Sequence, residues 1–248
     1  MAFKDYFSAQ AAGYALYRPQ YPPELFAWLA SISPAQQRVW DCATGSGQAA
    51  TALRAHFEQV VASDTSMAQL RQATPHASLR YVCCNAEQVP LGNTSLDLIT
   101  VAQAAHWFDL PRFYNEVERL LRPAGVLAIW CYGLFHVNPV IDALIQHYYK
   151  DTLGAYWPAE RHHIEQAYAQ LPFPYTLMET PAFTLQVRWN LSQVMGYLAT
   201  WSATQLYIKT TGDDPLPGLQ AELAVHWGDP DQAYHVEWPL HLKVGCKP

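Results

Sequence analysis

The feature that most constrains the fold is a short apolar segment that runs into a turn of small residues and then into a helical pattern. Residues 39–42 have the composition of a buried strand, residues 43–47 (Ala-Thr-Gly-Ser-Gly) form the turn, and the spacing of Ala and Leu becomes helical from Gln48. Gly45 and Gly47 permit positive φ and leave no Cβ between the backbone and a bound molecule. This order is typical of an open parallel sheet that binds a nucleotide-like ligand.

Two ligand classes fit this turn. Gly45-x-Gly47-x-x-Ala50 matches the dinucleotide fingerprint, whose last position accepts Gly or Ala. The alternative is the S-adenosylmethionine (SAM) loop, acidic-x-Gly-x-Gly-x-Gly, with Asp41 as the acid and Ala43 in place of the first Gly. The turn by itself leaves an NAD-dependent oxidoreductase and a SAM-binding protein both open.

The alternation of strand and helix patterns predicts a doubly wound α/β fold. Strand patterns recur at residues 39–42, 59–63, 79–83, 96–101, 126–131, 183–189 and 234–244. Five of them fall within about a hundred residues with helical segments between them, which indicates a mostly parallel sheet. We predict a seven-stranded, Rossmann-like sheet whose last two strands add an antiparallel C-terminal edge.

The predicted domain organisation follows changes in this rhythm. Beyond Gly133 the segments 158–171 and 191–209 look helical, and we interpret them as parts of a lid inserted into the sheet. The predicted divisions are an N-terminal helical flap (1–36), a core (37–136), a helical lid with one added strand (137–230) and the last sheet strand (231–248).

Composition narrows the class of protein. Of the 248 residues, 50% are hydrophobic and 15% charged, which favours a large core over disorder. The net charge of −6 and the lack of a basic run argue against nucleic-acid binding. The five cysteines form no Cys-x-x-Cys pair, which indicates reduced thiols and no metal site. No apolar stretch reaches the ~20 residues of a membrane span, so we expect a cytoplasmic monomer or homodimer.

Polar residues follow three of the predicted parallel strands. Asp64, Asn85 and Gln103 come directly after strand patterns, or within two residues of them. The carboxyl ends of parallel strands meet at one edge of a sheet, so we expect these residues beside the glycine turn. An acidic residue at the end of the second strand is placed to accept both hydroxyls of a ribose, and Asp64 has that position.

Several segments together resemble class I SAM-dependent methyltransferases of the methyltransferase type 11 group. They span most of residues 39–131 and lie at residues 39–47, 63–67, 85–90, 96–99 and 120–125. Residues 103–108, Arg18-Pro19 with Tyr21-Pro22, and residues 196–198 with Trp201-Ser202 resemble a narrower branch that includes trans-aconitate methyltransferase-like proteins.

The resemblance implies a role for each matching residue. Gly45 and Gly47 would pass under the methionine part of SAM, Asp41 would hold the loop, and Asp64 would take the ribose. Thr65 and Ala86 would flank the adenine, Asn85 would meet its amine, and the main chain at Gln103 would face the methionine amino group. The complete cofactor-binding set implied is Tyr14, Arg18, Asp41, Ala43, Gly45, Gly47, Asp64, Thr65, Met67, Asn85, Ala86, Glu87 and Gln103.

The chain departs from the family pattern at two positions. Ala43 replaces the usual Gly and Asn85 the usual Asp, so we expect weaker SAM binding but not its loss. Tyr21, Trp107 and Trp201 are the predicted substrate contacts.

Transfer of the methyl group to a small-molecule oxygen or nitrogen, or to a carboxylate, is the predicted reaction. A hydroxyl or amine would need a base, and His106 is the best-placed candidate, although it is equally well explained as a packed loop histidine. A SAM-binding protein without catalysis and an NAD-dependent oxidoreductase are the alternatives.

Overall fold

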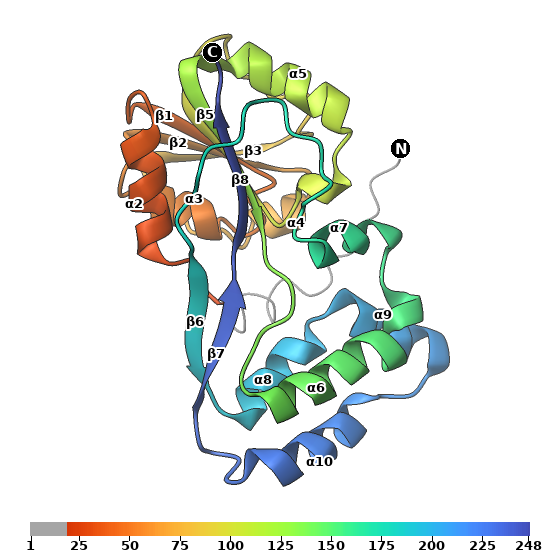
Figure 1. Cartoon of the computed structure of the whole chain (residues 1–248). Coiled ribbons are helices and arrows are strands. Elements are labelled where there is room, and N and C mark those ends of the chain that lie inside the picture. The colour runs from red at the N-terminus through yellow and green to blue at the C-terminus, as the bar shows by residue number, and fades with distance from the viewer. Residues whose placement is uncertain (1–18) are drawn as a thin grey trace. The chain divides into compact units, whose positions relative to one another are not determined.

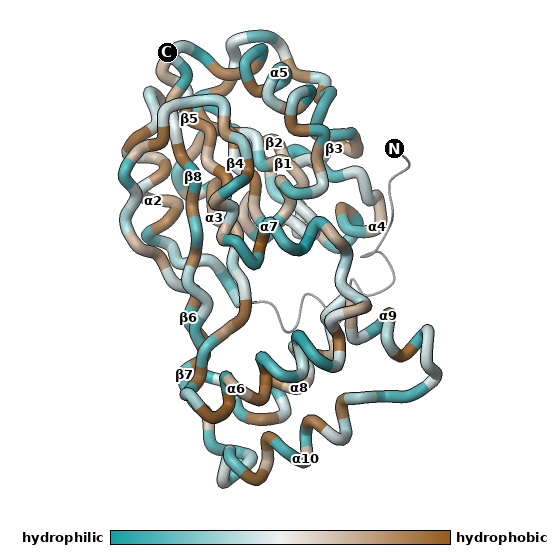
Figure 2. Tube along the Cα trace, turned by 45° about the vertical axis from the view of Figure 1, so that its right-hand side comes forward, coloured by the Kyte–Doolittle hydropathy of each residue, from teal (hydrophilic) through white to brown (hydrophobic). Residues whose placement is uncertain are grey.

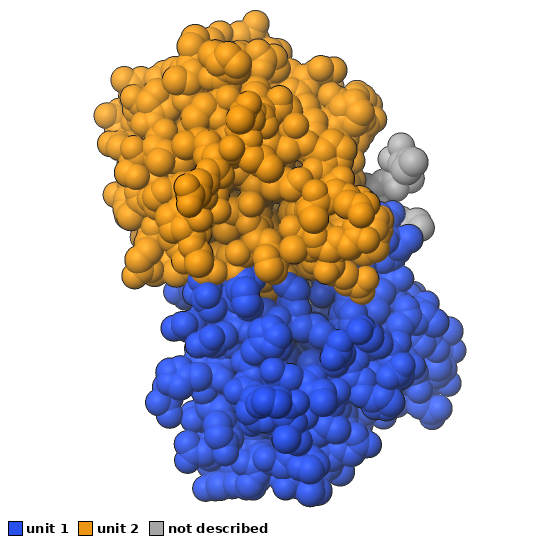
Figure 3. All heavy atoms as spheres, in the orientation of Figure 1, with its two compact units in different colours: residues 1–20, 133–161, 184–239 blue, residues 21–132, 162–183, 240–248 orange. Residues whose placement is uncertain are grey.

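The computed structural model describes residues 19–248, so Tyr14, Arg18 and most of the predicted flap lie outside the described residues. The chain divides into two compact units, shown in Figure 3. Unit 2 comprises residues 21–132, 162–183 and 240–248, and the described part of unit 1 comprises residues 19–20, 133–161 and 184–239. Each unit is described by itself.

Unit 2 contains a six-stranded sheet with the strand order β3-β2-β1-β4-β5-β8. The first five strands are parallel, and β8 pairs antiparallel with β5. The strands are β1 (Arg38–Cys42), β2 (Gln59–Asp64), β3 (Leu79–Cys83), β4 (Leu96–Ala102), β5 (Leu121–Cys131) and β8 (His241–Cys246) (Figure 1). The predicted doubly wound sheet with an antiparallel C-terminal edge is confirmed, but the predicted count of seven strands is wrong.

The difference in strand count arises because residues 184–189, expected at the edge of the main sheet, lie in a separate two-stranded sheet. Residues 234–244 were expected to form one strand, but they form β7 (Tyr234–Pro239) and β8, which belong to different sheets. Proline cannot donate a ladder hydrogen bond, so it ends a strand or occupies an edge. β7 pairs antiparallel with β6 (Thr184–Trp189) in a separate two-stranded sheet, and only β8 joins the main sheet.

Helices cover both faces of the main sheet. The β4 partners of Trp40 and Trp130 are three residues apart, an odd number, so the two indoles face opposite sides. Trp40 packs on Phe113 of α5 (Leu110–Leu120), with 6.2 Å between ring centroids. Trp130 packs on Phe26 of α2 (Pro23–Ile32) at 6.4 Å. α3 (Gln48–Leu53) and α4 (Met67–Leu70) complete the strand–helix alternation.

The sequence of α5 explains where it begins and which face it buries. The Asp109 side chain accepts a hydrogen bond from the backbone N–H of Arg112 and caps the helix, and a proline follows in the first turn. Phe113, Val117 and Leu120 recur at helical spacing and are fully buried. The alternation of brown and teal along α5 in Figure 2 follows this amphipathic pattern.

Unit 1 is helical apart from the β6–β7 pair. Its helices are α6 (Pro139–His147), α8 (Leu191–Ala199), α9 (Ser202–Thr211) and α10 (Leu216–Trp227). The predicted helix over residues 191–209 is therefore two helices, broken at Thr200 and Trp201. Within residues 19–248, no helix combines the length and the apolar character that crossing a membrane requires.

The compact units differ from the predicted domains at four places. Residues 21–36 and 162–183 cluster with the core, and residues 133–136 and 231–239 cluster with the helical unit. Instead of one helix, residues 158–171 contain a 3-10 turn and the short α7 (His162–Glu165). Ala167 and Tyr168 have φ of 52° and 59°, values that end a right-handed helix. The functional division into flap, core and lid remains a prediction.

Candidate functional site

The strand order of unit 2 places the candidate site where β1 and β4 lie side by side. The chain winds from β1 outward through β2 to β3, then returns to β4 on the other side of β1. Ligands of open α/β sheets bind outside the carboxyl ends of the strands at such a switch point. The glycine turn follows β1, Asp64 ends β2, and Gln103 follows β4, so the fold brings these predicted residues to one edge.

The glycine turn contains three residues with positive φ: Ala43 at 55°, Gly45 at 58° and Gly47 at 85°. A Cβ added at Gly45 would meet nothing nearer than Gln69 Oε1 at 4.0 Å, so this backbone borders open space. A Cβ at Gly47 would lie 2.6 Å from the Tyr81 hydroxyl. The missing Cβ of Gly47 therefore leaves room for the Tyr81 side chain. From the sequence, this glycine was explained by ligand approach alone.

Ala43 occupies a backbone conformation that favours glycine. For residues other than glycine the left-handed region costs about 1–2 kcal/mol, and such strain tends to occur at functional sites. The family's usual Gly at this position avoids that cost, so the turn of this chain contains a strained residue.

Asp41 is the next-to-last residue of β1 and is 1% exposed. Its Oδ2 accepts a hydrogen bond from the Thr44 hydroxyl and its Oδ1 accepts one from the Thr100 hydroxyl at 2.8 Å. Burial raises the pKa of Asp41 to about 6, although the two hydroxyls act in the opposite direction. The Asp41 carboxyl group therefore connects the turn to β4, and its ionisation costs free energy because it is buried.

Asp64 is held by the backbone on both of its oxygens. Gly45 N–H donates to Oδ2 at 2.9 Å, and Ser66 N–H donates to Oδ1 at 2.8 Å. A carboxylate has about four acceptor positions, and these two backbone groups use one position on each oxygen. Asp64 is partly exposed and directly bonded to the turn. This arrangement fits the two vicinal hydroxyls of a ribose.

The other predicted adenosine contacts lie in the loops that follow β2 and β3. Thr65 is partly exposed, and Met67 is 47% exposed at the start of α4. Asn85 is exposed and Ala86 is buried after β3. Glu87 Oε1 accepts a hydrogen bond from the Asp109 N–H at 3.1 Å, so it fastens its loop to the start of α5.

Gln103 follows β4 with φ of 56°. Its backbone N–H donates to the Trp130 carbonyl at 2.9 Å, and its side-chain Nε2 donates to the Tyr132 carbonyl at 2.9 Å. Both hydrogen bonds connect the residue to β5 and the residue that follows it.

His106 is 9% exposed in the loop between β4 and α5. Its Nδ1 lies 2.8 Å from the Tyr168 hydroxyl, and its ring packs on Trp107 at 4.7 Å between centroids. Tyr168 is fully buried, whereas Trp107 is 37% exposed. The predicted base is thus oriented by a tyrosine from a segment that the sequence assigned to the lid.

Tyr21 and Trp201, two predicted substrate contacts, belong to different units. In unit 2, the Tyr21 ring packs edge-on against Trp130 at 5.5 Å and Tyr132 at 6.4 Å. In unit 1, Trp201 is 7% exposed and stacks with Tyr148 at 6.2 Å. These ring contacts account for the burial of Trp201 without a ligand.

Sequence reasoning missed Thr100, Tyr132 and Tyr168 as partners of predicted site residues. Thr100 is the one hydroxyl side chain in the otherwise apolar residues 98–101, and this signal was available. No sequence signal identifies Tyr132 and Tyr168 as partners, because only the tertiary structure brings them to Gln103 and His106.

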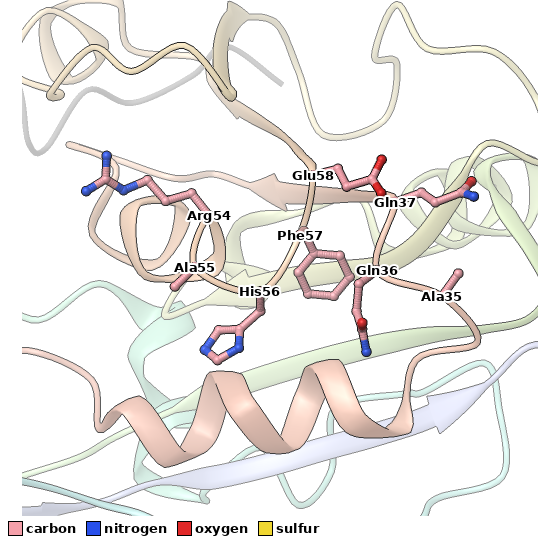
Figure 4. Close-up of a pocket in the computed structure, with 8 residues that line it drawn as sticks. All are labelled: Ala35, Gln36, Gln37, Arg54, Ala55, His56, Phe57 and Glu58. Atoms are coloured by element: carbon pink, nitrogen blue, oxygen red, sulfur yellow. The ribbon is translucent and has the colours of Figure 1, made fainter.

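A hollow of about 620 Å³ lies at the opposite end of β1 and β2. Its lining residues precede these two strands and include Gln36, Arg54 and His56, as Figure 4 shows. Gln36 donates through Nε2 to the Ala30 carbonyl of α2 at 3.1 Å. Because it borders the amino ends of the strands, the hollow is separate from the glycine turn. Among the described residues no group of three His, Cys, Asp or Glu side chains is placed to hold a metal ion.

Comparison with known proteins identifies a family whose matching segment contains this candidate site. The sequence profile of the methyltransferase domain family matches residues 40–129, which contain the turn, Asp64 and Gln103. A provisionally assigned methyltransferase of Dictyostelium discoideum is 35% identical over 252 residues, which cover 99% of this chain and 96% of the relative. An uncharacterised methyltransferase of Mycobacterium tuberculosis is 38% identical over 126 residues, half of each chain.

A solved structure extends the likeness to the whole fold. A provisionally assigned type II methyltransferase from Anaeromyxobacter dehalogenans superposes with a TM-score of 0.88 and 41% identity. The match covers 93% of this chain and 98% of that one, so it includes residues beyond the profile match.

Proposed function

The chain belongs to the class I SAM-dependent methyltransferases, and from this premise we propose that it methylates an oxygen or nitrogen atom of a small molecule. SAM is its cofactor and S-adenosylhomocysteine the product. When bound, SAM supplies an activated methyl group on a sulfonium, so the protein mainly has to position the acceptor.

The observation that carries the proposal is the Asp64 carboxylate beside the open face of Gly45. Two backbone N–H groups fix its oxygens before a ligand arrives, which lowers the cost of ordering them. Asp64 would hold the ribose, and the Gly45 backbone would border the methionine part. Asp41 would stabilise the turn by accepting the hydrogen bond of the Thr44 hydroxyl.

His106 is the proposed base for an acceptor that must lose a proton. The Tyr168 hydroxyl at 2.8 Å from Nδ1 fixes the orientation of the ring. General bases contribute about 10²- to 10⁴-fold to a rate. His106→Gln should therefore lower kcat by that order and leave SAM affinity unchanged. A carboxylate acceptor needs no base, and with it the variant would keep its kcat.

Methyl transfer is tested by incubating the protein with SAM and a metabolite extract and measuring S-adenosylhomocysteine. Formation that depends on the extract supports the proposal. Tight SAM binding without turnover in any extract would favour the non-catalytic alternative, for which the strained Ala43 is the supporting observation. Tight NAD binding without SAM binding would contradict the cofactor assignment. The monomeric or homodimeric state, the cytoplasmic location and the trans-aconitate-like branch remain predictions.

A further inference from the structure

Gln103 is held in one position at an energetic cost. Its φ of 56° lies in the left-handed region, which residues other than glycine rarely occupy. Its N–H and its Nε2 both donate to carbonyl groups, of Trp130 and Tyr132 respectively, at 2.9 Å. The orientation of the side-chain amide follows from the second bond, because a flipped amide would place two oxygens against each other.

This orientation leaves the amide oxygen without a partner. Gln103 Oε1 is buried and accepts no hydrogen bond from any described residue. An unsatisfied buried acceptor costs free energy, and in a native protein it calls for an explanation such as a ligand or an ordered water. A strained backbone and an unused acceptor on one residue indicate that a group outside the described residues satisfies it.

The position of this oxygen separates it from the glycine turn and Asp64. The glycine turn and Asp64 follow β1 and β2, on one side of β4. The Gln103 amide is bonded to Tyr132, which follows β5 on the other side of β4. The Tyr132 ring in turn packs on Tyr21, a predicted substrate contact. The amide therefore lies toward β5 and an aromatic cluster, away from the turn.

We propose that Gln103 Oε1 binds the methyl acceptor and selects one that offers an O–H or N–H donor. This proposal rests on the proposed function and narrows its substrate class to hydroxyl- and amine-bearing compounds. A site with a fixed acceptor discriminates strongly against compounds that leave it unpaired, and a carboxylate would place a negative oxygen against it. In the reaction the methyl group would bond to the acceptor oxygen or nitrogen as its bond to the sulfonium breaks and leaves a thioether, and the acceptor proton would pass to His106 and from there to solvent.

The test compares Gln103→Leu with a matched control, Gln36→Leu. Gln36 makes the same kind of bond, Nε2 to a backbone carbonyl, but at the amino end of the sheet. S-adenosylhomocysteine affinity is measured by calorimetry for each protein. Binding and turnover are then measured for 3-phenylpropanol, 3-phenylpropylamine and 3-phenylpropanoate, which share one carbon skeleton. Binding of each compound is measured in the presence of S-adenosylhomocysteine, so that binding is detected even where turnover is slow.

We expect the unmodified protein to prefer the alcohol or the amine over the carboxylate. Gln103→Leu should lower that preference by about 10- to 100-fold, the effect of losing one partner of a buried hydrogen bond. S-adenosylhomocysteine affinity should stay within about threefold, because the cofactor contact implied for Gln103 belongs to its main chain, which the substitution keeps. Gln36→Leu should behave as the unmodified protein.

Four results would overturn the proposal. A preference for the carboxylate would contradict the substrate class, as would a panel of which no member binds. A parallel loss of S-adenosylhomocysteine affinity in Gln103→Leu would assign the oxygen to the cofactor. Equal preference in both variants would mean that the oxygen holds a buried water only. Failure of the unmodified protein to bind S-adenosylhomocysteine would instead refute the proposed function itself.

Discussion

Asp41→Asn should change how stability depends on pH. Burial raises the pKa of Asp41 from 3.8 to about 6, so between these values the unfolded chain is ionised while the folded protein keeps the proton. The folded state then binds more protons, and the free energy of unfolding falls as pH rises through this window. A shift of about two units at about 1.4 kcal/mol each corresponds to about 3 kcal/mol.

The Asn side chain has nearly the same shape but does not ionise. The variant therefore lacks this pH-dependent cost, and its stability relative to the unmodified protein should rise by roughly 2–3 kcal/mol between pH 4 and pH 7. Chemical denaturation of both proteins at matched pH values measures this difference. Contributions of other titrating groups cancel when one curve is subtracted from the other.

Asp97 provides the control. It is as buried as Asp41, but partners of its carboxylate offset the cost of burying the charge. Its carboxylate pairs with Arg122 at 2.7 Å and accepts the N–H groups of Gln37 and Arg38 at 2.9 and 2.8 Å. Asp97→Asn breaks a buried pair and should be destabilising at pH 7. A stability difference for Asp41→Asn that stays flat from pH 4 to pH 7 would refute the reasoning about burial.

Three further substitutions test the turn and its neighbours. Asp64→Ala should weaken SAM binding by roughly 1.5–3 kcal/mol without unfolding the chain; unchanged affinity in calorimetry would remove Asp64 from the site. Gly47→Ala should lower the free energy of unfolding by roughly 2–4 kcal/mol, because φ is 85° and Tyr81 is 2.6 Å from the new Cβ; Tyr81→Phe in the same protein should restore only part. Ala43→Gly should raise the melting temperature by relieving about 1 kcal/mol of strain, and a lower melting temperature would show that the Ala43 methyl group packs favourably.

The parallel sheet was predictable because its strands combine apolar composition with short, regular separations. Residues 79–83 were predicted as a strand and β3 has those bounds. The ends of β1 and β2 differ from prediction by one residue each. The prediction of one strand over residues 234–244 was wrong, because the alternation of apolar and polar residues does not show which neighbouring strand each half pairs with. Only the missing N–H of Pro239 marks the division between β7 and β8.

The candidate site was predictable where a residue's position relative to a strand end determines its location. This applies to Asp64 and Gln103, since every parallel strand delivers its last residue to the same edge. Orientation was not predictable, since the Asp64 oxygens depend on two backbone N–H groups and the Gln103 amide depends on Tyr132. A sequence reports these residues as polar, but it does not report which of their atoms remain available to a ligand.

His106 shows why the same limit applies to a proposed base. Its partner Tyr168 is 62 positions away, in a segment whose composition suggested a helix. Two consecutive residues with positive φ, Ala167 and Tyr168, end the helix there, and the buried Tyr168 hydroxyl lies 2.8 Å from Nδ1. Backbone strain of this kind persists only where surrounding contacts compensate for it. The chemistry open to His106 is therefore set by a backbone conformation that neither the histidine nor its neighbours in sequence reveal.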